Sequence, residues 1–261
     1  MWNPQQYLQF QAQRDRPFFD LLAQVRGQPE WIADLGCGTG HLTAALTARW
    51  PQAQITGVDS SPEMLAQAAA HISIHTSPML SFVQADLSTW QPSRPPDLLI
   101  SNAALQWVDG HDQLLPRLAG RLAPGGTLAF QVPGNFSAPS HTLLAEVCAR
   151  PEWASRLKPE QRDKAALGQY GPAEYTALLA ALGFEVNAWE TTYLHLLPAA
   201  ENAVLEWVKG TALRPVLAQL TPPDAEAFLT DYGAELRRAY PTFDYGTPLA
   251  FRRIFVVAAW G

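Results

Sequence analysis

The sequence predicts a doubly wound α/β fold: a mostly parallel, seven-stranded sheet with a helical cap insertion. Short apolar runs alternate with helical patterns between residues 30 and 132, and this alternation is typical of a parallel sheet built from βαβ units. Runs such as Asp97-Leu98-Leu99-Ile100 are almost continuously apolar, which indicates strands covered by helices on both faces. The 261 residues, 48% hydrophobic and 16% charged, are enough to bury one large core and are not typical of disorder.

Each expected element has its own local signal. Ser60 or Ser61 is expected to cap a helix that has Pro62 in its first turn. The Ala-Pro-Gly-Gly loop at 123–126 ends the next helix, and Gly183 ends the one after it. The expected helices are His41–Trp50, Pro62–His71, Asp112–Ala123 and Pro172–Leu182. The expected strands are Trp31–Leu35, Gln54–Asp59, Leu80–Ala85, Asp97–Asn102, Thr127–Val132, Phe184–Leu196 and Leu249–Ala259.

The chain divides into five expected parts. A cap insertion is expected where apolar residues recur at helical spacing after the sixth strand, and a further cap segment where three prolines interrupt the pattern. The parts are an N-terminal helical lid at 1–29, an α/β core at 30–132, a cap segment at 133–171, completion of the sheet at 172–197 and 249–261, and the cap insertion at 198–248.

Charge and cysteine content exclude several classes of function. The net charge is −6, and each half on either side of Phe130 carries −3, so the chain has no basic footprint for nucleic acid. The two cysteines, Cys37 and Cys148, form neither a disulfide framework nor a zinc spacing. The first residues do not read as a signal peptide, and no apolar run reaches the roughly 20 residues of a membrane span. We expect a cytoplasmic protein with no metal, no nucleic acid, no membrane and no evident protein partner.

A glycine-rich turn follows the first expected strand and opens the first helix. It reads Asp34-Leu35-Gly36-Cys37-Gly38-Thr39-Gly40, and glycines at this spacing let the backbone turn tightly and approach a ligand closely. A turn without a ligand is the alternative. The second strand ends in Asp59, and a carboxylate there can accept hydrogen bonds from both hydroxyls of a ribose. The turn therefore favours a ligand that contains adenosine.

The spacing of the turn separates two classes of cofactor. The spacing is Gly-x-Gly-x-Gly and not the Gly-x-Gly-x-x-Gly of dinucleotide-binding proteins. This difference argues against the hypothesis that the protein is a nicotinamide-dependent oxidoreductase. Asp34 can bind a positively charged amino group, which S-adenosylmethionine has and a nicotinamide dinucleotide lacks at that place. S-adenosyl-L-methionine is the expected cofactor.

With Asp59, Asp86-Leu87 and Asn102, this turn resembles the class I S-adenosylmethionine-dependent methyltransferases over about residues 31–132. The resemblance implies a Rossmann-like fold. It also implies that the glycine loop wraps the methionine part of the cofactor, that the end of the second strand binds the ribose, and that Asp86 meets the adenine amino group. The cofactor-binding residues it implies are Asp34, Gly36, Cys37, Gly38, Gly40, Asp59, Ser60, Met64, Asp86, Leu87 and Asn102, with Tyr7 and Arg14 in a lid; Met64 is equally compatible with a core position, and Tyr7 and Arg14 with a loose tail.

Segments outside this region carry a narrower resemblance. They are residues 2–8, 14–17, 101–107, 191–195 and 207–215, and in combination they resemble the family of trans-aconitate methyltransferases over nearly the whole chain. The resemblance implies methyl transfer to a carboxylate of a small tricarboxylic acid. Enzymes that methylate carrier-bound malonyl groups share the cofactor half, and a non-catalytic cofactor-binding module is a further alternative.

A carboxylate acceptor needs no general base, because its pKa near 4 leaves it ionised at neutral pH. No catalytic base is therefore expected. The acceptor site should supply cations and donors, and the candidates are Gln106, Trp107, Tyr193, His195 and Arg214. Trp107 is equally compatible with a core position, and a lone histidine such as His195 is more often structural than a ligand group. For Arg252 and Arg253 a solvated surface is favoured, since neighbouring strand residues point to opposite sides and at most one can face a pocket.

Overall fold

The computed structural model describes residues 11–75, 79–158, 170–210 and 212–260. Their contacts divide the chain into two compact units. The sheet unit contains residues 15–133, 170–191 and 253–260, and the helical unit contains residues 11–14, 134–158 and 192–252, where these are described. Within the described ranges, no helix combines the length and the apolar character needed to cross a membrane.

The sheet has seven strands in the order β3-β2-β1-β4-β5-β7-β6, which confirms the predicted fold class. The first five strands run parallel, and β5 pairs antiparallel with β7. All seven expected strands are present, with bounds within two residues of the prediction. They are β1 (Trp31–Leu35), β2 (Gln54–Asp59), β3 (Leu80–Gln84), β4 (Leu98–Asn102), β5 (Thr127–Pro133), β6 (Phe184–Leu197) and β7 (Thr247–Trp260).

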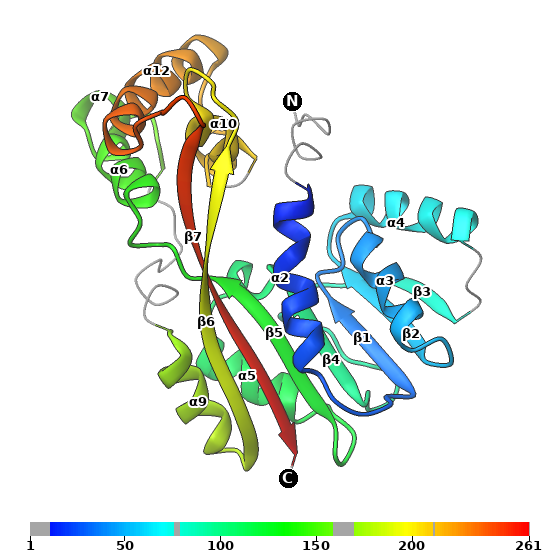
Figure 1. Ribbon diagram of the computed structural model, residues 1–261. Helices are drawn as coiled ribbons and strands as arrows, with labels where there is room; N and C mark the ends of the chain where they lie inside the picture. Colours follow the sequence, from blue (N-terminus) through cyan, green and yellow to red (C-terminus); the bar gives the residue numbers. More distant parts are fainter. Residues whose placement is uncertain (1–10, 76–78, 159–169, 211, 261) are drawn as a thin grey trace. The chain divides into compact units, whose positions relative to one another are not determined.

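Helices cover both faces of the sheet in the sheet unit. Helix α2 (Gln11–Gln24) crosses the front face in Figure 1, and α5 (His111–Ala119) lies behind the sheet. The cluster behind the sheet joins Leu35, Leu99 and Phe130 to α5 and to α9 (Pro172–Ala180). Every second residue of these strands faces this core, and the residues between them face the opposite side of the sheet, where those of β1 and most of those of β4 are buried as well.

Two helix bounds differ from the prediction. Helix α4 (Pro62–His75) continues four residues beyond its expected end, because the first helix-breaking residue after it is Pro78. Helix α5 stops at Ala119 and not at Ala123, because Gly120 disfavours helix and the chain turns there, with the Leu122 N–H donating to the Ala119 carbonyl oxygen. Helix α3 (His41–Arg49) and α9 match their expected positions closely.

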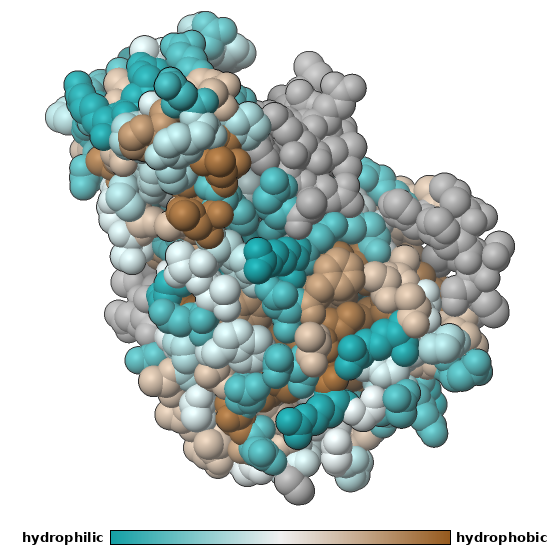
Figure 2. All heavy atoms as spheres, viewed as in Figure 1, coloured by the Kyte–Doolittle hydropathy of each residue, from teal (hydrophilic) through white to brown (hydrophobic). Residues whose placement is uncertain are grey.

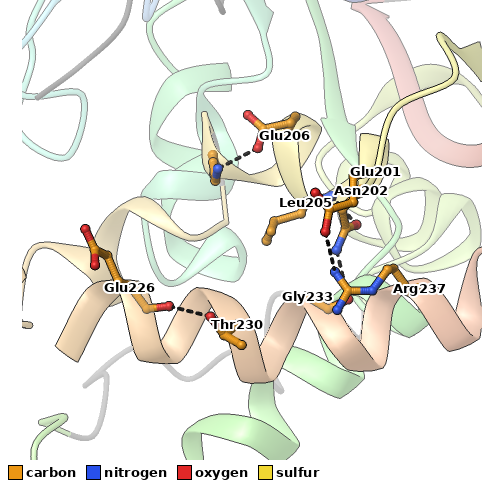
Figure 3. A network of polar contacts seen from close by, with 9 residues as sticks. Glu201, Asn202, Leu205, Glu206, Glu226, Thr230, Gly233 and Arg237 are labelled. Atoms are coloured by element: carbon orange, nitrogen blue, oxygen red, sulfur yellow. Dashed lines mark hydrogen bonds and ion pairs between the residues drawn. The ribbon is translucent and has the colours of Figure 1, made fainter. Parts of the chain in front are cut away.

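The helical unit contains α6 (Pro139–Cys148), α7 (Pro151–Ala154), α10 (Ala203–Lys209), α11 (Arg214–Leu217) and α12 (Pro222–Ala239). Figure 3 shows how α10 and α12 are joined. Asn202 caps α10 by accepting from the Leu205 N–H at 3.2 Å, and its amide donates to the Gly233 carbonyl oxygen at 2.8 Å. Arg237 on α12 lies 3.9 Å from Glu201 in the same network.

Strands β6 and β7 run through both units, so neither unit coincides with one of the expected parts. Residues 192–197 and 249–252, expected in the sheet, cluster with the helical unit, and residues 15–29 cluster with the sheet unit. The division into lid, core and cap stays a prediction. Figure 2 shows a largely hydrophilic surface on the visible face, interrupted by small apolar groups. Exposed large apolar side chains include Trp107 in the sheet unit and Leu194 in the helical unit.

Candidate functional site

Three backbone N–H groups of the glycine loop donate hydrogen bonds to the end of β2. The N–H groups of Gly36 and Cys37 donate to the Val58 carbonyl oxygen at 2.7 and 3.0 Å. The Gly38 N–H donates to Oδ2 of Asp59 at 2.9 Å. The loop therefore lies at the carboxyl ends of β1 and β2, which is where ligands bind in open parallel sheets.

Two of the loop's glycines are required for different reasons. Gly36 has φ 76°, and a Cβ there would lie 2.1 Å from Cβ of Ala104, so the loop packs directly on the segment after β4. Gly38 has φ 55°, and no described atom lies within 4 Å of the position that its Cβ would occupy. A side chain at Gly38 would enter open space, which is the property expected where a ligand passes the backbone.

Asp59 holds two elements together. Its Oδ2 accepts from Gly38, and its Oδ1 accepts from the Ser61 N–H at 2.9 Å. Ser61, and not Ser60, caps α4, because its Oγ accepts from the Met64 N–H at 3.2 Å. Each carboxylate oxygen can accept a further hydrogen bond, so these contacts leave Asp59 able to bind ribose hydroxyls.

Asp34 is buried and points toward α3. Its Oδ2 accepts from the Thr43 hydroxyl at 2.6 Å, and only 3% of the residue is exposed. Burial raises the pKa of Asp34 to about 6, while the Thr43 hydroxyl and His41 act in the opposite direction. A cation bound nearby would lower this pKa. The carboxyl group would therefore ionise more readily when a positively charged ligand binds.

A contact that the sequence did not predict joins α2 to the glycine loop. His41, the first residue of α3, lies with Nδ1 3.1 Å from the Thr39 hydroxyl and with Nε2 2.9 Å from Oδ1 of Asp15. This contact places the described part of α2 beside the loop. Of the two residues predicted for a lid, Arg14 lies on α2 and Tyr7 lies outside the described residues.

The remaining predicted cofactor residues differ in exposure. Asp86 is exposed, and the hydroxyl and N–H of Ser88 lower its pKa. Leu87 is buried in the main core cluster, and Met64 is half-buried. Ser60 is exposed, Cys37 is buried with its thiol pKa raised by burial, and Gly40 is the N-cap of α3. Asn102 is half-buried at the end of β4, where its Oδ1 accepts from Nε2 of Gln131.

The segment after β4 is strained and well anchored. Ala103 has φ 53°, a region that residues other than glycine seldom occupy and that often marks functional sites. Gln106 donates through Nε2 to the Ala103 carbonyl oxygen at 2.5 Å, and its buried Oε1 has no partner in the described part of the chain. Oε1 is therefore an acceptor able to meet a donor of a ligand.

His111 contacts the segment after β4 and helps to hold it in place. The sequence did not predict this contact either. Its Nδ1 lies 2.8 Å from the Tyr175 hydroxyl, and its Nε2 lies 2.9 Å from the Leu105 carbonyl oxygen. Burial lowers the pKa of His111, which favours the neutral ring. A neutral ring satisfies both contacts when Nε2 donates to Leu105 and Nδ1 accepts from Tyr175.

The predicted acceptor residues fall into both units. Gln106 and Trp107 lie in the sheet unit on η1 (Leu105–Trp107), and Trp107 is 48% exposed. In the helical unit, Tyr193 and His195 are buried with stacked rings 6.2 Å apart, and His195 lies 5.0 Å from the Trp207 ring. Arg214 is exposed at the start of α11.

The solvated surface expected for Arg252 and Arg253 is wrong. Arg253 is only 7% exposed, and its Nη1 donates to Oε1 of Gln131 at 3.2 Å. Arg252 is half-buried, and its Nη1 donates to the Gly134 carbonyl oxygen at 3.0 Å. The antiparallel pairing of β5 with β7 brings both arginines against protein atoms, and alternation along one strand could not show this.

The arrangement of the loop fits S-adenosylmethionine. Gly38 faces open space, Asp59 lies beside it as a charged acceptor, and Asp34 is a buried carboxyl group that a cation would stabilise in its ionised form. In the described part of the chain, no group of three or more His, Cys, Asp or Glu residues is placed to hold a metal ion.

Residues 32–126 match a family described as a methyltransferase domain. Relatives align over nearly the whole chain. The trans-aconitate 2-methyltransferase of Streptomyces avermitilis is 52% identical over 98% of this chain and 96% of that protein. Those of Rhodococcus jostii and Escherichia coli O1:K1 are 45% and 44% identical, over 99% and 98% of this chain and 99% and 97% of theirs.

Solved structures support the same fold. The YcgJ protein of Bacillus subtilis aligns with a TM-score of 0.58 at 16% identity, over 94% of this chain and 97% of that one. A putative methyltransferase of Bacillus halodurans aligns with a TM-score of 0.58 at 15% identity, over 94% of this chain and 98% of that one. At these identities the likeness shows the fold alone.

Proposed function

Because the chain belongs to the trans-aconitate 2-methyltransferase family, we propose that it transfers the methyl group of S-adenosylmethionine to a carboxylate of trans-aconitate. The products are the monomethyl ester and S-adenosylhomocysteine. The observation that carries this proposal is the extent of the similarity. The methyltransferase domain match ends at residue 126, whereas the relatives match 98% or more of the chain, including the helical unit.

The sulfonium group of the cofactor, when bound, supplies an activated methyl group. The protein's part is to hold donor and acceptor in line, an effect that is worth about 7–11 kcal/mol in favourable systems. Asp59 binds the ribose, the loop from Gly36 to Gly40 encloses the methionine part, and Asp34 meets its amino group. Asp86 and Leu87 contact the adenine ring.

No side chain is needed as a general base, since the acceptor carboxylate is already ionised at neutral pH. The chemical step should therefore lack the steep rise with pH that a hydroxyl or amine acceptor would show. Arg214, with Tyr193 and His195, is proposed to bind acceptor carboxylates that are not methylated. The support for Arg214 is its exposed guanidinium, which can pair with a carboxylate in two parallel hydrogen bonds.

The test is release of S-adenosylhomocysteine with and without trans-aconitate, followed by mass spectrometry of the ester. A panel of other small acids and a carrier-bound malonyl group belongs in the same experiment. Release that depends on trans-aconitate supports the proposal. Methylation of the malonyl group alone, or cofactor binding without any turnover, contradicts it.

A further inference from the structure

A row of polar side chains lies on one face of the sheet at the carboxyl ends of its parallel strands. Leu128, Phe130 and Val132 of β5 belong to the core cluster behind the sheet, so Gln131 points to the opposite face. By the same alternation on β7, Ile254 and Val256 face that core, and Arg253 points with Gln131.

Strand pairing brings the members of this row together. Asn102 of β4 is the register partner of Gln131, and Arg253 pairs with Pro133, two residues beyond Gln131. The resulting side-chain contacts are Arg253 Nη1 to Gln131 Oε1 at 3.2 Å and Gln131 Nε2 to Asn102 Oδ1 at 2.5 Å. The face is also that of Asp34, since Ala33 and Leu35 lie in the core behind the sheet.

The chemistry of Arg253 fixes the direction of every bond in the row. A guanidinium has no acceptor, so Gln131 must present its oxygen to Arg253 and its nitrogen to Asn102. Asn102 must then accept through its oxygen, which turns its own amide nitrogen away from Gln131. The row therefore starts from a buried positive charge and ends in a hydrogen-bond donor at the tip of β4.

We propose that this row binds a carboxylate of the acceptor that is not methylated, with the Arg253 guanidinium as the cation and the Asn102 amide as a second donor. The inference rests on the proposed function and assigns the subsite for a small polycarboxylate. A planar guanidinium held by Gln131 suits two-point binding of a carboxylate. Its place at the carboxyl ends of β4 and β5 is where substrates approach in this class of sheet.

If Arg253 had only a structural role, its contact with Gln131 would connect β7 to β5 and would not affect acceptor binding. The substitution Gln131→Glu distinguishes this structural role from a role in binding the acceptor. A carboxylate at position 131 would form an ion pair with Arg253. This ion pair would keep or strengthen the contact between β5 and β7, but it would neutralise the positive charge of the guanidinium. Binding of trans-aconitate to the protein saturated with S-adenosylhomocysteine, measured by calorimetry, should weaken by about 30-fold or more. KM for trans-aconitate should rise by a similar factor, while the cofactor Kd should stay unchanged and the unfolding midpoint should not fall.

Arg253→Lys and Arg252→Gln complete the set. Arg253→Lys should also weaken acceptor binding, because an ammonium lacks the fork. Arg252→Gln is the matched control, since it removes the neighbouring guanidinium, and it should leave acceptor binding unchanged. For an analogue with that carboxylate replaced by a carboxamide, the loss caused by Gln131→Glu should largely disappear.

The outcomes separate the two proposals. If the parent protein turns over trans-aconitate and Gln131→Glu binds it as tightly as the parent does, the subsite is wrong and the function stands. Equal weakening of cofactor binding would assign Arg253 to the cofactor and also overturn the subsite. If the parent binds trans-aconitate without turnover and Gln131→Glu does not bind it, the function is wrong and the subsite stands. A parent that neither binds nor methylates the acid overturns both.

Discussion

Replacing Asp34 by Asn should stabilise the folded chain at neutral pH and weaken its binding of S-adenosylmethionine. The Asp34 carboxyl group is buried beneath the glycine loop, and burial raises its pKa to about 6. An ionised carboxylate at that position therefore disfavours folding. Asn has nearly the same shape and can still accept from the Thr43 hydroxyl, which donates to Asp34 at 2.6 Å.

The sign and size of the effect follow from the pKa. Below about pH 4 the carboxyl group is protonated in both states, so Asp34 does not change stability. Between about pH 4 and about pH 6 the unfolded chain loses its proton first, so stability falls as pH rises. Above about pH 6 the loss is complete, and at about 1.4 kcal/mol for each pKa unit it amounts to about 3 kcal/mol. Asp34→Asn should recover most of this free energy.

Urea unfolding of parent and variant, without cofactor, at about pH 4 and about pH 7.5 measures the effect. We expect the variant to gain up to about 3 kcal/mol relative to the parent at the higher pH and little at the lower one. Calorimetry should show cofactor binding weakened roughly 10- to 100-fold, because a charge-assisted contact is lost. A difference in unfolding free energy that is the same at both pH values would refute the reasoning. Thr43→Val, which removes the donor to an ionised carboxylate, should destabilise the chain at the higher pH.

Three further predictions concern single contacts. Gly38→Ala and Gly125→Ala both place a side chain at positive φ with open space around it, so each should lose about 1–2 kcal/mol of stability, but only Gly38→Ala should weaken cofactor binding in calorimetry. Equal cofactor affinity in both variants would show that no ligand passes Gly38. Asp59→Asn should weaken cofactor binding by about 1.5–3 kcal/mol, and unchanged affinity in a folded variant would remove Asp59 from the ribose site. Asn202→Ala loses the cap of α10 and the bond to α12, so urea unfolding should show a loss of about 1–2 kcal/mol, whereas a loss no larger than that of the exposed Thr230→Ala would contradict this account.

The parts of the site that the sequence predicted are those made within one short segment. The tight turn of the glycine loop, with positive φ at Gly36 and Gly38, follows from glycines placed between a strand and a helix. The predicted end of α5 lies four residues beyond the observed one, although the residue that ends the helix is also local. The Pro-Gly-Gly signal at 124–126 is strong, but Gly120 already ends the helix, and the weaker signal came first along the chain.

The contacts that sequence reasoning missed join segments far apart in the chain. Arg253 and Gln131 are 122 residues apart, and His111 and Tyr175 are 64 apart. Nothing in the sequence near either partner specifies such a pair. Each depends on which strands or helices become neighbours in the folded sheet.

The two adjacent arginines show what strand pairing adds to strand alternation. Alternation states that Arg252 and Arg253 point to opposite sides, and it cannot say which side is occupied. The register Gln131↔Phe255 decides this, because it places Arg253 diagonally across from Gln131 on the face of the sheet that also carries Asp34 and Asn102. A shift of β7 by one residue would exchange the two arginines and turn Phe255 out of its place opposite Gln131. The position of the buried charge is therefore determined by the same apolar residues that fix the register, and a substrate charge bound there would depend on the packing of β7 as much as on the arginine itself.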